Sequence, residues 1–251
     1  MKPPDLSTAT KMQAPSGRLR GVNHSAGYSY LLSLPPGPDA GPAGRRPLLL
    51  FLHGIGERGT DVWRVALQGL PKLLHGQPGL TAAEQQIGRE VAAQFIVVAP
   101  QCPRDEVWDS TALLALLDEA DREFQPDPAR IYVTGLSLGG YGTWKLGLRQ
   151  PGRFAAIAPI CGGGSIADIT TALRTDPVAL QRLPVWAFHG AKDRVVPPSE
   201  SERLVRALKA AGTAEVKYTL YPDAEHDSWS ATYANRELYT WLLAHSARRV
   251  P

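Results

Sequence analysis

One serine lies among glycines directly after a β-branched run, and this pattern is typical of a nucleophile. The stretch VTGLSLGG, residues 133–140, places Ser137 between Gly135 and Gly139. A nucleophile on a tight strand-to-helix turn needs small flanking residues, because larger side chains would collide with neighbouring backbone. The following helix directs N–H groups and its positive dipole end at the site. The alternative is a glycine-rich turn with an incidental serine.

A serine nucleophile needs a histidine base, and in this strand-turn-helix arrangement the chain order is serine, acid, histidine. Of the six histidines, His189, His226 and His245 follow Ser137. His226 lies in the loop after the last expected strand, where its side chain can reach the ends of other strands, so we predict that it is the base. His189 is expected to be structural at a strand tip, and His245 a solvated or core residue of the terminal helix.

The acid that orients the base is predicted to be Asp193. This residue stands just past the expected strand 184–190, at a carboxyl-end loop where open α/β sheets place their sites. Asp223 and Asp227 are the alternatives, but each is too close in sequence to His226 to approach the ring easily. Ser137, Asp193 and His226 are therefore the predicted catalytic residues.

An oxyanion formed by serine attack needs preorganised donors. The N–H of Leu138, directly after the nucleophile, is one predicted donor. The second is expected from the loop FLHGIGERG, residues 51–59, where we predict the N–H of Ile55, with Gly54 as the alternative.

Aromatic residues near these loops are candidate walls of a substrate pocket. They are Trp63, Trp108 and Trp229, and packing beneath a loop is the alternative for each. His53 and Glu57 are expected to fix the loop rather than to perform chemistry. The residues expected in the core of the helix after Ser137 are Tyr141 and Trp144.

Apolar runs of strand length alternate with segments of helical periodicity. The runs expected as strands are 28–34, 47–53, 95–100, 130–135, 154–160, 184–190 and 216–222. The segments expected as helices are 110–124, 138–150, 198–212 and 232–247, and Ser110 is expected to cap the first of them. The alternation predicts an α/β fold with a mostly parallel central sheet and helices on both faces.

The domain organisation expected is a polar N-terminal segment, 1–27, followed by a single domain, 28–251. The interval 54–94 is the least regular part of the sequence, and residues 57–94 within it are a candidate cap over the substrate. No lid-sized insertion is expected between residues 160 and 184, which favours a small ester.

Composition excludes several partner classes. The formal charge is +3 with scattered Lys and Arg, which argues against nucleic acid, and no apolar run is long enough for a membrane span. Cys102 and Cys161 are expected to be buried free thiols, so no disulfide, metal site or cofactor is predicted. A cytoplasmic location is expected, with a removed export signal as the alternative.

The sequence resembles the α/β-hydrolase superfamily, in particular bacterial esterases of the phospholipase/carboxylesterase and dienelactone hydrolase-like group, some of which are described as peptidases. The matching segments are LLLFLHGIGERG, FIVVAPQCP, RIYVTGLSLGGYGTWKL, RFAAIAPICGGG, PVWAFHGAKDRVVP and HDSWSATYANRELYTWLLAH. The resemblance implies the α/β-hydrolase fold, Ser137 as nucleophile with Asp193 and His226 as partners, and an oxyanion hole from the HGIG loop and Leu138.

The function expected is a metal-free serine esterase acting on small, short-chain carboxylic esters through an acyl-enzyme. An amidase or peptidase, a thioesterase, acyl transfer to an alcohol, and a non-catalytic binding protein on this fold are the alternatives. The oligomeric state is not predicted from the sequence.

Overall fold

A single mixed sheet forms the centre of the protein in the computed structural model, which describes residues 19–23, 27–37 and 45–247. The strand order in this part of the chain is β1-β2-β4-β3-β5-β6-β7-β8. The strands are β1 (Arg20–Val22), β2 (Tyr30–Ser33), β3 (Leu48–Leu52), β4 (Ile96–Pro100), β5 (Ile131–Leu136), β6 (Ala156–Ile160), β7 (Val185–Gly190) and β8 (Val216–Tyr221). β2 pairs antiparallel with β1 and β4, and all other neighbours are parallel.

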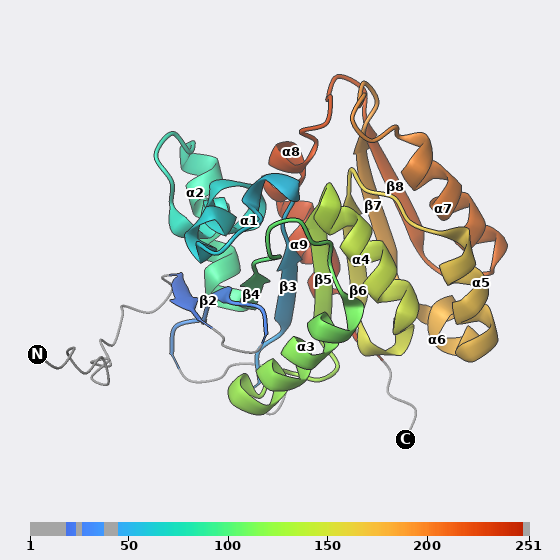
Figure 1. Ribbon diagram of the computed structural model, residues 1–251, viewed down its shortest axis with the longest axis horizontal. Coiled ribbons are helices and arrows are strands. Elements are labelled where there is room, and N and C mark those ends of the chain that lie inside the picture. Colours follow the sequence, from blue (N-terminus) through green and yellow to red (C-terminus); the bar gives the residue numbers. More distant parts are fainter. Residues whose placement is uncertain (1–18, 24–26, 38–44, 248–251) are drawn as a thin grey trace, which may run out of the picture.

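Helices cover both faces of the sheet (Figure 1). The α-helices are α1 (Gly69–His75), α2 (Ala82–Gln94), α3 (Ser110–Phe124), α4 (Leu138–Arg149), α5 (Ile166–Thr175), α6 (Pro177–Arg182), α7 (Ser199–Ala210), α8 (Trp229–Tyr233) and α9 (Arg236–Leu243). The short 3-10 helices are η2 (Ile55–Glu57), η3 (Val62–Leu67) and η4 (Pro151–Arg153). Residues of η3, α1, α2, α8 and α9 share one buried apolar cluster, and those of α3 to α7 share the other.

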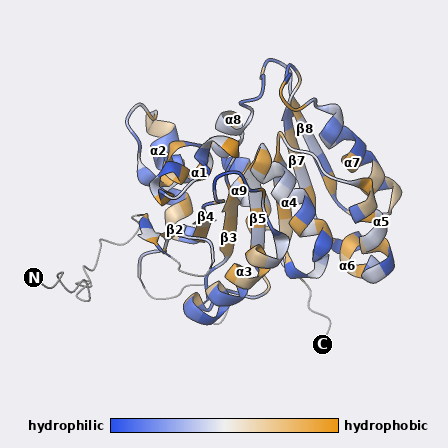
Figure 2. Ribbon diagram, viewed as in Figure 1, coloured by the Kyte–Doolittle hydropathy of each residue, from blue (hydrophilic) through white to orange (hydrophobic). Residues whose placement is uncertain are grey.

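The central strands are buried on both faces because their side chains alternate between the two helical layers. In β3, Leu49 and Phe51 join the cluster with α2 and α9, whereas Leu48, Leu50 and Leu52 join the cluster with α3 and α4. β3 is accordingly coloured hydrophobic in Figure 2. The expected α/β architecture, with a mostly parallel sheet and helices on both faces, is confirmed.

Several element boundaries differ from the sequence prediction. The segment expected to be polar, 1–27, contributes the edge strand β1, and its residues 1–18 and 24–26 lie outside the described part of the chain. Ser110 is the first residue of α3 rather than its cap, because the Asp109 carboxylate accepts the N–H of Ala112 at 2.7 Å. The segment 160–184 contains α5 and α6, two helices that the sequence prediction did not include.

The terminal helix, expected as one unit over 232–247, is divided into α8 and α9. Asn235 lies between them in an extended conformation, and its side chain accepts the N–H of Glu237 at 3.0 Å. A side-chain oxygen in this position satisfies a free N–H of the new helix, so Asn235 starts α9.

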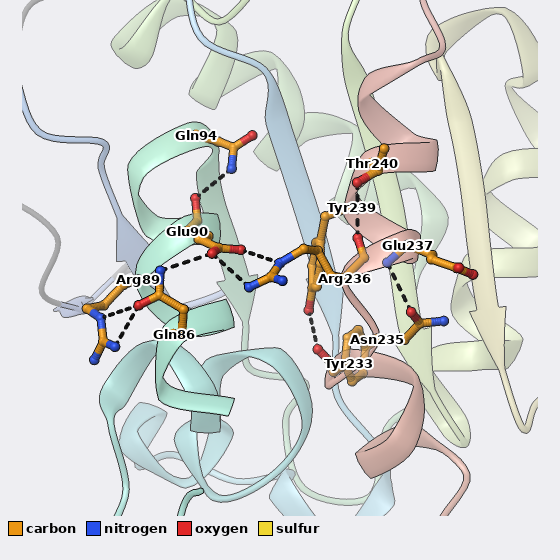
Figure 3. Close-up of polar contacts among 10 residues, drawn as sticks. All are labelled: Gln86, Arg89, Glu90, Gln94, Tyr233, Asn235, Arg236, Glu237, Tyr239 and Thr240. Carbon is orange, nitrogen blue, oxygen red and sulfur yellow. Dashed lines mark hydrogen bonds and ion pairs between the residues drawn. The ribbon is translucent and has the colours of Figure 1, made fainter. Parts of the chain in front are cut away.

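The second half of the candidate cap, residues 57–94, covers the sheet. This half is α2, whose Ile87 and Val91 are buried in the same cluster as α9. Figure 3 shows Arg236 of α9 reaching Glu90 of α2, with Nε at 2.8 Å and Nη2 at 2.9 Å from the two carboxylate oxygens. α2 is therefore part of the layer that covers the sheet, and a capping role for the remainder stays a prediction.

Two further properties follow from the helices and cysteines. Within the described ranges, no helix combines the length and apolarity needed to cross a bilayer. Cys102 and Cys161 are both free and buried, as the sequence predicts.

Candidate active site

Ser137 occupies a strained turn between β5 and α4. Its φ of 53° and ψ of −115° are unusual for a residue with a side chain, and they hold the hydroxyl clear of both elements. A Cβ on Gly139 would overlap the carbonyl oxygen of Leu52, and a Cβ on Gly135 would lie 2.5 Å from that of Gly139. The flanking glycines therefore let α4 pack directly against the end of β3.

Ser137 meets a histidine and an aspartate that come from two other loops. The Ser137 Oγ lies 2.9 Å from His226 Nε2, and His226 Nδ1 lies 2.7 Å from Asp193 Oδ2. The carboxylate accepts the Nδ1 proton, which leaves Nε2 free to accept the serine proton. The His226 side chain is 20% exposed, whereas that of Asp193 is fully buried. The structure thus brings together the three predicted catalytic side chains in a continuous hydrogen-bonded chain.

Asp193 is held as a charged acceptor. Its Oδ1 accepts the backbone N–H groups of Val195 and Val196, each at 2.9 Å. Burial raises the pKa of Asp193, but the hydrogen bonds from His226 and these two N–H groups outweigh it, so the pKa lies below its ordinary value. An ionised Asp193 can fix one tautomer of His226 and stabilise its cation.

The alternative acids and bases are engaged elsewhere. The Asp223 carboxylate accepts Lys192 Nζ at 2.8 Å, and Asp227 accepts both the N–H and the hydroxyl of Ser230 at 2.9 Å. His245 contacts Glu215 at 3.0 Å, next to α9. None of these contacts leads to Ser137.

The glycine-containing loop after β3 lies against Ser137. A Cβ on Gly54 would lie 3.6 Å from that of Ser137. The Gly54 N–H is occupied, because it donates to Glu57 Oε2 at 3.1 Å. Ile55 and Leu138 are the first residues of η2 and α4, where N–H groups have no acceptor within the helix. This arrangement favours Ile55 over Gly54 as the partner of Leu138 in an oxyanion hole.

Five successive carbonyl groups, those of residues 53–57, are each bound by a side chain. Trp108 donates to the carbonyl of His53 at 3.2 Å, and His53 donates to that of Gly54 at 2.6 Å. Arg58 donates to the carbonyl of Ile55 at 3.3 Å, Arg64 to that of Gly56 at 2.9 Å and Gln101 to that of Glu57 at 2.8 Å. Because the C=O and N–H of a trans peptide point in opposite directions, these bonds also fix the direction of the N–H groups. The loop is therefore preorganised by its surroundings.

His53 is a neutral, buried part of this loop. Its Nε2 accepts the N–H of Cys102 at 2.9 Å, so its proton resides on Nδ1 and is donated to the Gly54 carbonyl. Burial lowers the pKa of His53 from 6.5 to about 4, although the hydrogen bond to Gly54 raises it. The expected role of His53 and Glu57 in fixing the loop agrees with these bonds.

We predict that His53 makes the fold less stable in acid. Between the folded pKa of about 4 and the unfolded value of 6.5, only the unfolded chain binds this proton. The contribution of neutral His53 to the free energy of unfolding is complete above pH 6.5, and it falls by about 3 kcal/mol as the pH drops to the folded pKa. Urea unfolding at pH 7.5 and 4.5 should show a smaller difference for His53→Gln than for the wild type. Exposed His75→Gln is the control, and equal pH dependence in all three proteins would contradict the prediction.

The three candidate pocket tryptophans lie in different environments. Trp229 packs edge-on against His226, with ring centroids 5.4 Å apart. Trp63 is 43% exposed and packs on His75, and the structure gives it no contact with the catalytic candidates. Trp108 is 3% exposed and donates to the His53 carbonyl, so it supports the loop after β3 instead of lining an open pocket.

Two residues beside the catalytic candidates were not predicted. Tyr141 was expected in the core but is 37% exposed, one helical turn after Ser137, whereas Trp144 is fully buried as expected. Val195 is 71% exposed, two residues after Asp193. The spacing of four residues between Ser137 and Tyr141 on a helix could have placed Tyr141 near the serine. The short VVP stretch after Asp193 gave no signal that Val195 would be exposed.

The sheet order together with a serine at a strained β5–α4 turn defines the α/β-hydrolase fold. A family model described as the prolyl oligopeptidase family matches residues 165–248, which include Asp193 and His226.

Comparisons with known proteins identify esterases and a depolymerase as relatives over part of their length. The chain is 27% identical over 170 residues to the poly(3-hydroxyoctanoate) depolymerase of Pseudomonas fluorescens, covering 60% of this chain and 59% of the relative. It is 28% identical over 204 residues to a bifunctional acetylxylan esterase/xylanase of Neocallimastix patriciarum, covering 78% and 26%. A solved thermostable esterase superposes with a TM-score of 0.69 at 31% identity, covering 91% and 62%. These findings confirm the resemblance to esterases of the α/β-hydrolase superfamily, and the chain spans less than two thirds of each relative.

Proposed function

We propose that the protein is a serine hydrolase that cleaves carboxylic esters through an acyl-enzyme. The observation that carries this proposal is the hydrogen-bonded chain from Ser137 Oγ through His226 to Asp193, with distances of 2.9 and 2.7 Å, at a strained turn. The relatives named as a depolymerase of a polyester and as an acetylxylan esterase support ester chemistry.

The proposed reaction has two halves. Ser137 Oγ attacks the ester carbonyl while His226 Nε2 takes its proton, and the N–H groups of Ile55 and Leu138 stabilise the oxyanion. The imidazolium then protonates the departing alcohol, leaving an acyl-serine. In the second half a water attacks the acyl group, His226 takes the water proton, and the proton returns to Ser137 as the acid leaves. Asp193 stays ionised throughout and stabilises the charged ring.

Three exposed apolar side chains favour an ester with apolar groups. They are Ile55 at 60%, Tyr141 at 37% and Val195 at 71% exposed. Each is close in sequence to an oxyanion-hole or catalytic candidate, and Trp229 packs on His226. We infer a small ester whose acyl or alcohol part contacts these side chains.

The direct test is a substrate panel combined with active-site labelling. We expect hydrolysis of p-nitrophenyl acetate and butyrate, insensitive to EDTA, and a fluorophosphonate adduct on the peptide that contains Ser137. Absence of both hydrolysis and labelling would support the binding-protein alternative. The prolyl oligopeptidase match over residues 165–248 makes an amidase the second candidate. Faster cleavage of matched acyl p-nitroanilides than of the esters would favour it, and faster cleavage of matched thioesters would favour a thioesterase.

We predict that Trp229→Ala weakens substrate binding more than it slows the chemistry. Loss of apolar contact worth about 1 kcal/mol should raise KM for p-nitrophenyl butyrate about fivefold, with kcat within about threefold. Trp63→Ala is the matched control, since its ring packs on His75 and we expect its KM to be unchanged. An equal KM increase in both variants would contradict a specific role for Trp229.

The proposed location is the cytoplasm, a reducing compartment in which two unpaired buried cysteines, Cys102 and Cys161, are compatible with folding. Fractionation of cells that produce the protein tests this proposal, and recovery from the culture medium would contradict it.

A further inference from the structure

The carboxylate of Asp193 is contacted by a second histidine besides His226. His189 lies in β7, and its Nε2 is 3.2 Å from Asp193 Oδ2, the same oxygen that His226 approaches. The side chains of both His189 and Asp193 are completely buried. A buried histidine against the proposed catalytic acid is a candidate for a role in the reaction, because its removal would alter that acid directly.

The hydrogen-bond partners of His189 define which ring nitrogen carries a proton. Nε2 faces only acceptors, the Val196 carbonyl at 2.9 Å and the Asp193 carboxylate, so it must be protonated. Nδ1 lies 2.8 Å from the hydroxyl of Ser201, which is also 3.0 Å from the Gly162 carbonyl. The Ser201 hydroxyl, which carries a single proton for these two acceptors, ties the orientation of the ring to the Gly162 carbonyl.

His189 also fixes the turn that carries the acid. The carbonyl of Val196 is bound by the ring, and the N–H of the same residue is bound by Asp193 Oδ1. On the other side of the ring, Nδ1 contacts Ser201 of α7, whose hydroxyl donates to the carbonyl of Gly162 in the loop after β6. The carboxylate of Asp193 is therefore fixed both by the turn and by the ring that supports it.

We propose that His189 is a positioning residue that holds the Asp193 carboxylate in the orientation required by His226. This inference rests on the proposed function. His189 itself has no path to the serine, since the ring of His226 lies between Asp193 and Ser137. Burial, followed by repulsion from His226, lowers the pKa of His189 despite the hydrogen bond to Val196 and the attraction of Asp193. A neutral His189 leaves the reaction proton to His226.

The test is a double-mutant cycle on kcat for p-nitrophenyl butyrate. Misplacement of the acid in His189→Leu should lower kcat about 10- to 100-fold with KM within about twofold. His189→Gln, whose amide can donate from nearly the same place as Nε2, should recover most of that loss. Asp193→Asn should lower kcat about 10⁴-fold. If His189 acts through Asp193, adding His189→Leu to Asp193→Asn should change kcat by less than about twofold.

Two further variants keep the test decisive. Ser201→Ala retains the ring and removes the hydroxyl that contacts Nδ1 and fixes the orientation of the ring, so it should lower kcat about fivefold even where His189→Leu does not fold. Thr213→Val removes another buried hydroxyl, which donates to the Leu180 carbonyl at 3.3 Å, and should leave kcat unchanged. Multiplicative effects in the cycle, or full kcat in both His189→Leu and Ser201→Ala, would overturn the proposal. If these results are found while Asp193→Asn is inactive, only the role of His189 is refuted and the esterase proposal stands. Full activity of Ser137→Ala would refute the esterase proposal.

Discussion

Ser137→Ala is expected to lower kcat for p-nitrophenyl butyrate by about 10⁵- to 10⁶-fold, the largest loss anticipated for any single side chain of this protein. The hydroxyl is the group that would form the acyl bond. Among the described residues, Ser137 provides the hydroxyl within hydrogen-bond distance of His226 Nε2, so no neighbouring side chain can replace it. Residual rate acceleration would come from the oxyanion donors and from substrate binding, which the substitution leaves in place.

The structural change in this variant is small. Alanine keeps the Cβ, the backbone bond from the Ser137 N–H to the Ile160 carbonyl at 3.0 Å, and the contacts of Gly135 and Gly139. The melting temperature should therefore stay near that of the wild type. Covalent labelling by a fluorophosphonate should disappear together with activity, which links the two measurements to one atom.

The control for this experiment is Ser246→Ala, which removes an exposed serine after α9. We expect its kcat to remain within about twofold and its labelling to be complete, as for most surface substitutions. Turnover by Ser137→Ala at the wild-type rate, or an adduct on another residue of the wild type, would contradict the assignment of the nucleophile.

The sheet was predictable because its central strands are buried on both faces. A run such as residues 47–53 contains no polar residue until His53, and it folds as β3, Leu48–Leu52. β1 was missed because three residues at the edge of the sheet carry no such pattern. α2 was missed although Thr81 and Glu84 provide a capping box, with the Glu84 N–H 3.2 Å from the threonine hydroxyl.

The site was predictable where loops follow parallel strands, and not where a contact depends on how a loop turns. Strand order placed Ser137, Asp193 and His226 at the same edge of the sheet, and the structure brings their side chains together. Their catalytic roles stay a prediction. The sequence left Ile55 and Gly54 as alternatives, since the bond between Gly54 and Glu57 depends on the local fold. The contact between His189 and Asp193 likewise requires a turn after β7 that the pattern HGAKD does not specify.

Gly139→Ala is expected to lower the free energy of unfolding by about 4 kcal/mol or more. Any of the variant that still folds is expected to be inactive. The added Cβ would overlap the backbone carbonyl of Leu52 and would lie 2.8 Å from that of His53. A flexible side chain could rotate away from such a clash, but backbone at the end of β3 cannot move without disturbing the sheet. Movement there would also shift the loop that carries the proposed oxyanion donor Ile55.

The expected defect therefore comes from where the methyl group points and not from the substitution itself. Alanine normally favours helices over glycine, by up to about 1 kcal/mol, so an effect of backbone propensity alone would have the opposite sign. Gly152→Ala is the matched control, because its Cβ meets nothing closer than 3.5 Å. Urea unfolding should show a large loss for Gly139→Ala and little change for Gly152→Ala. Equal stability of the two variants would mean that α4 can move away from β3, and the close packing of Ser137 against the loop after β3 would then not be required for the fold.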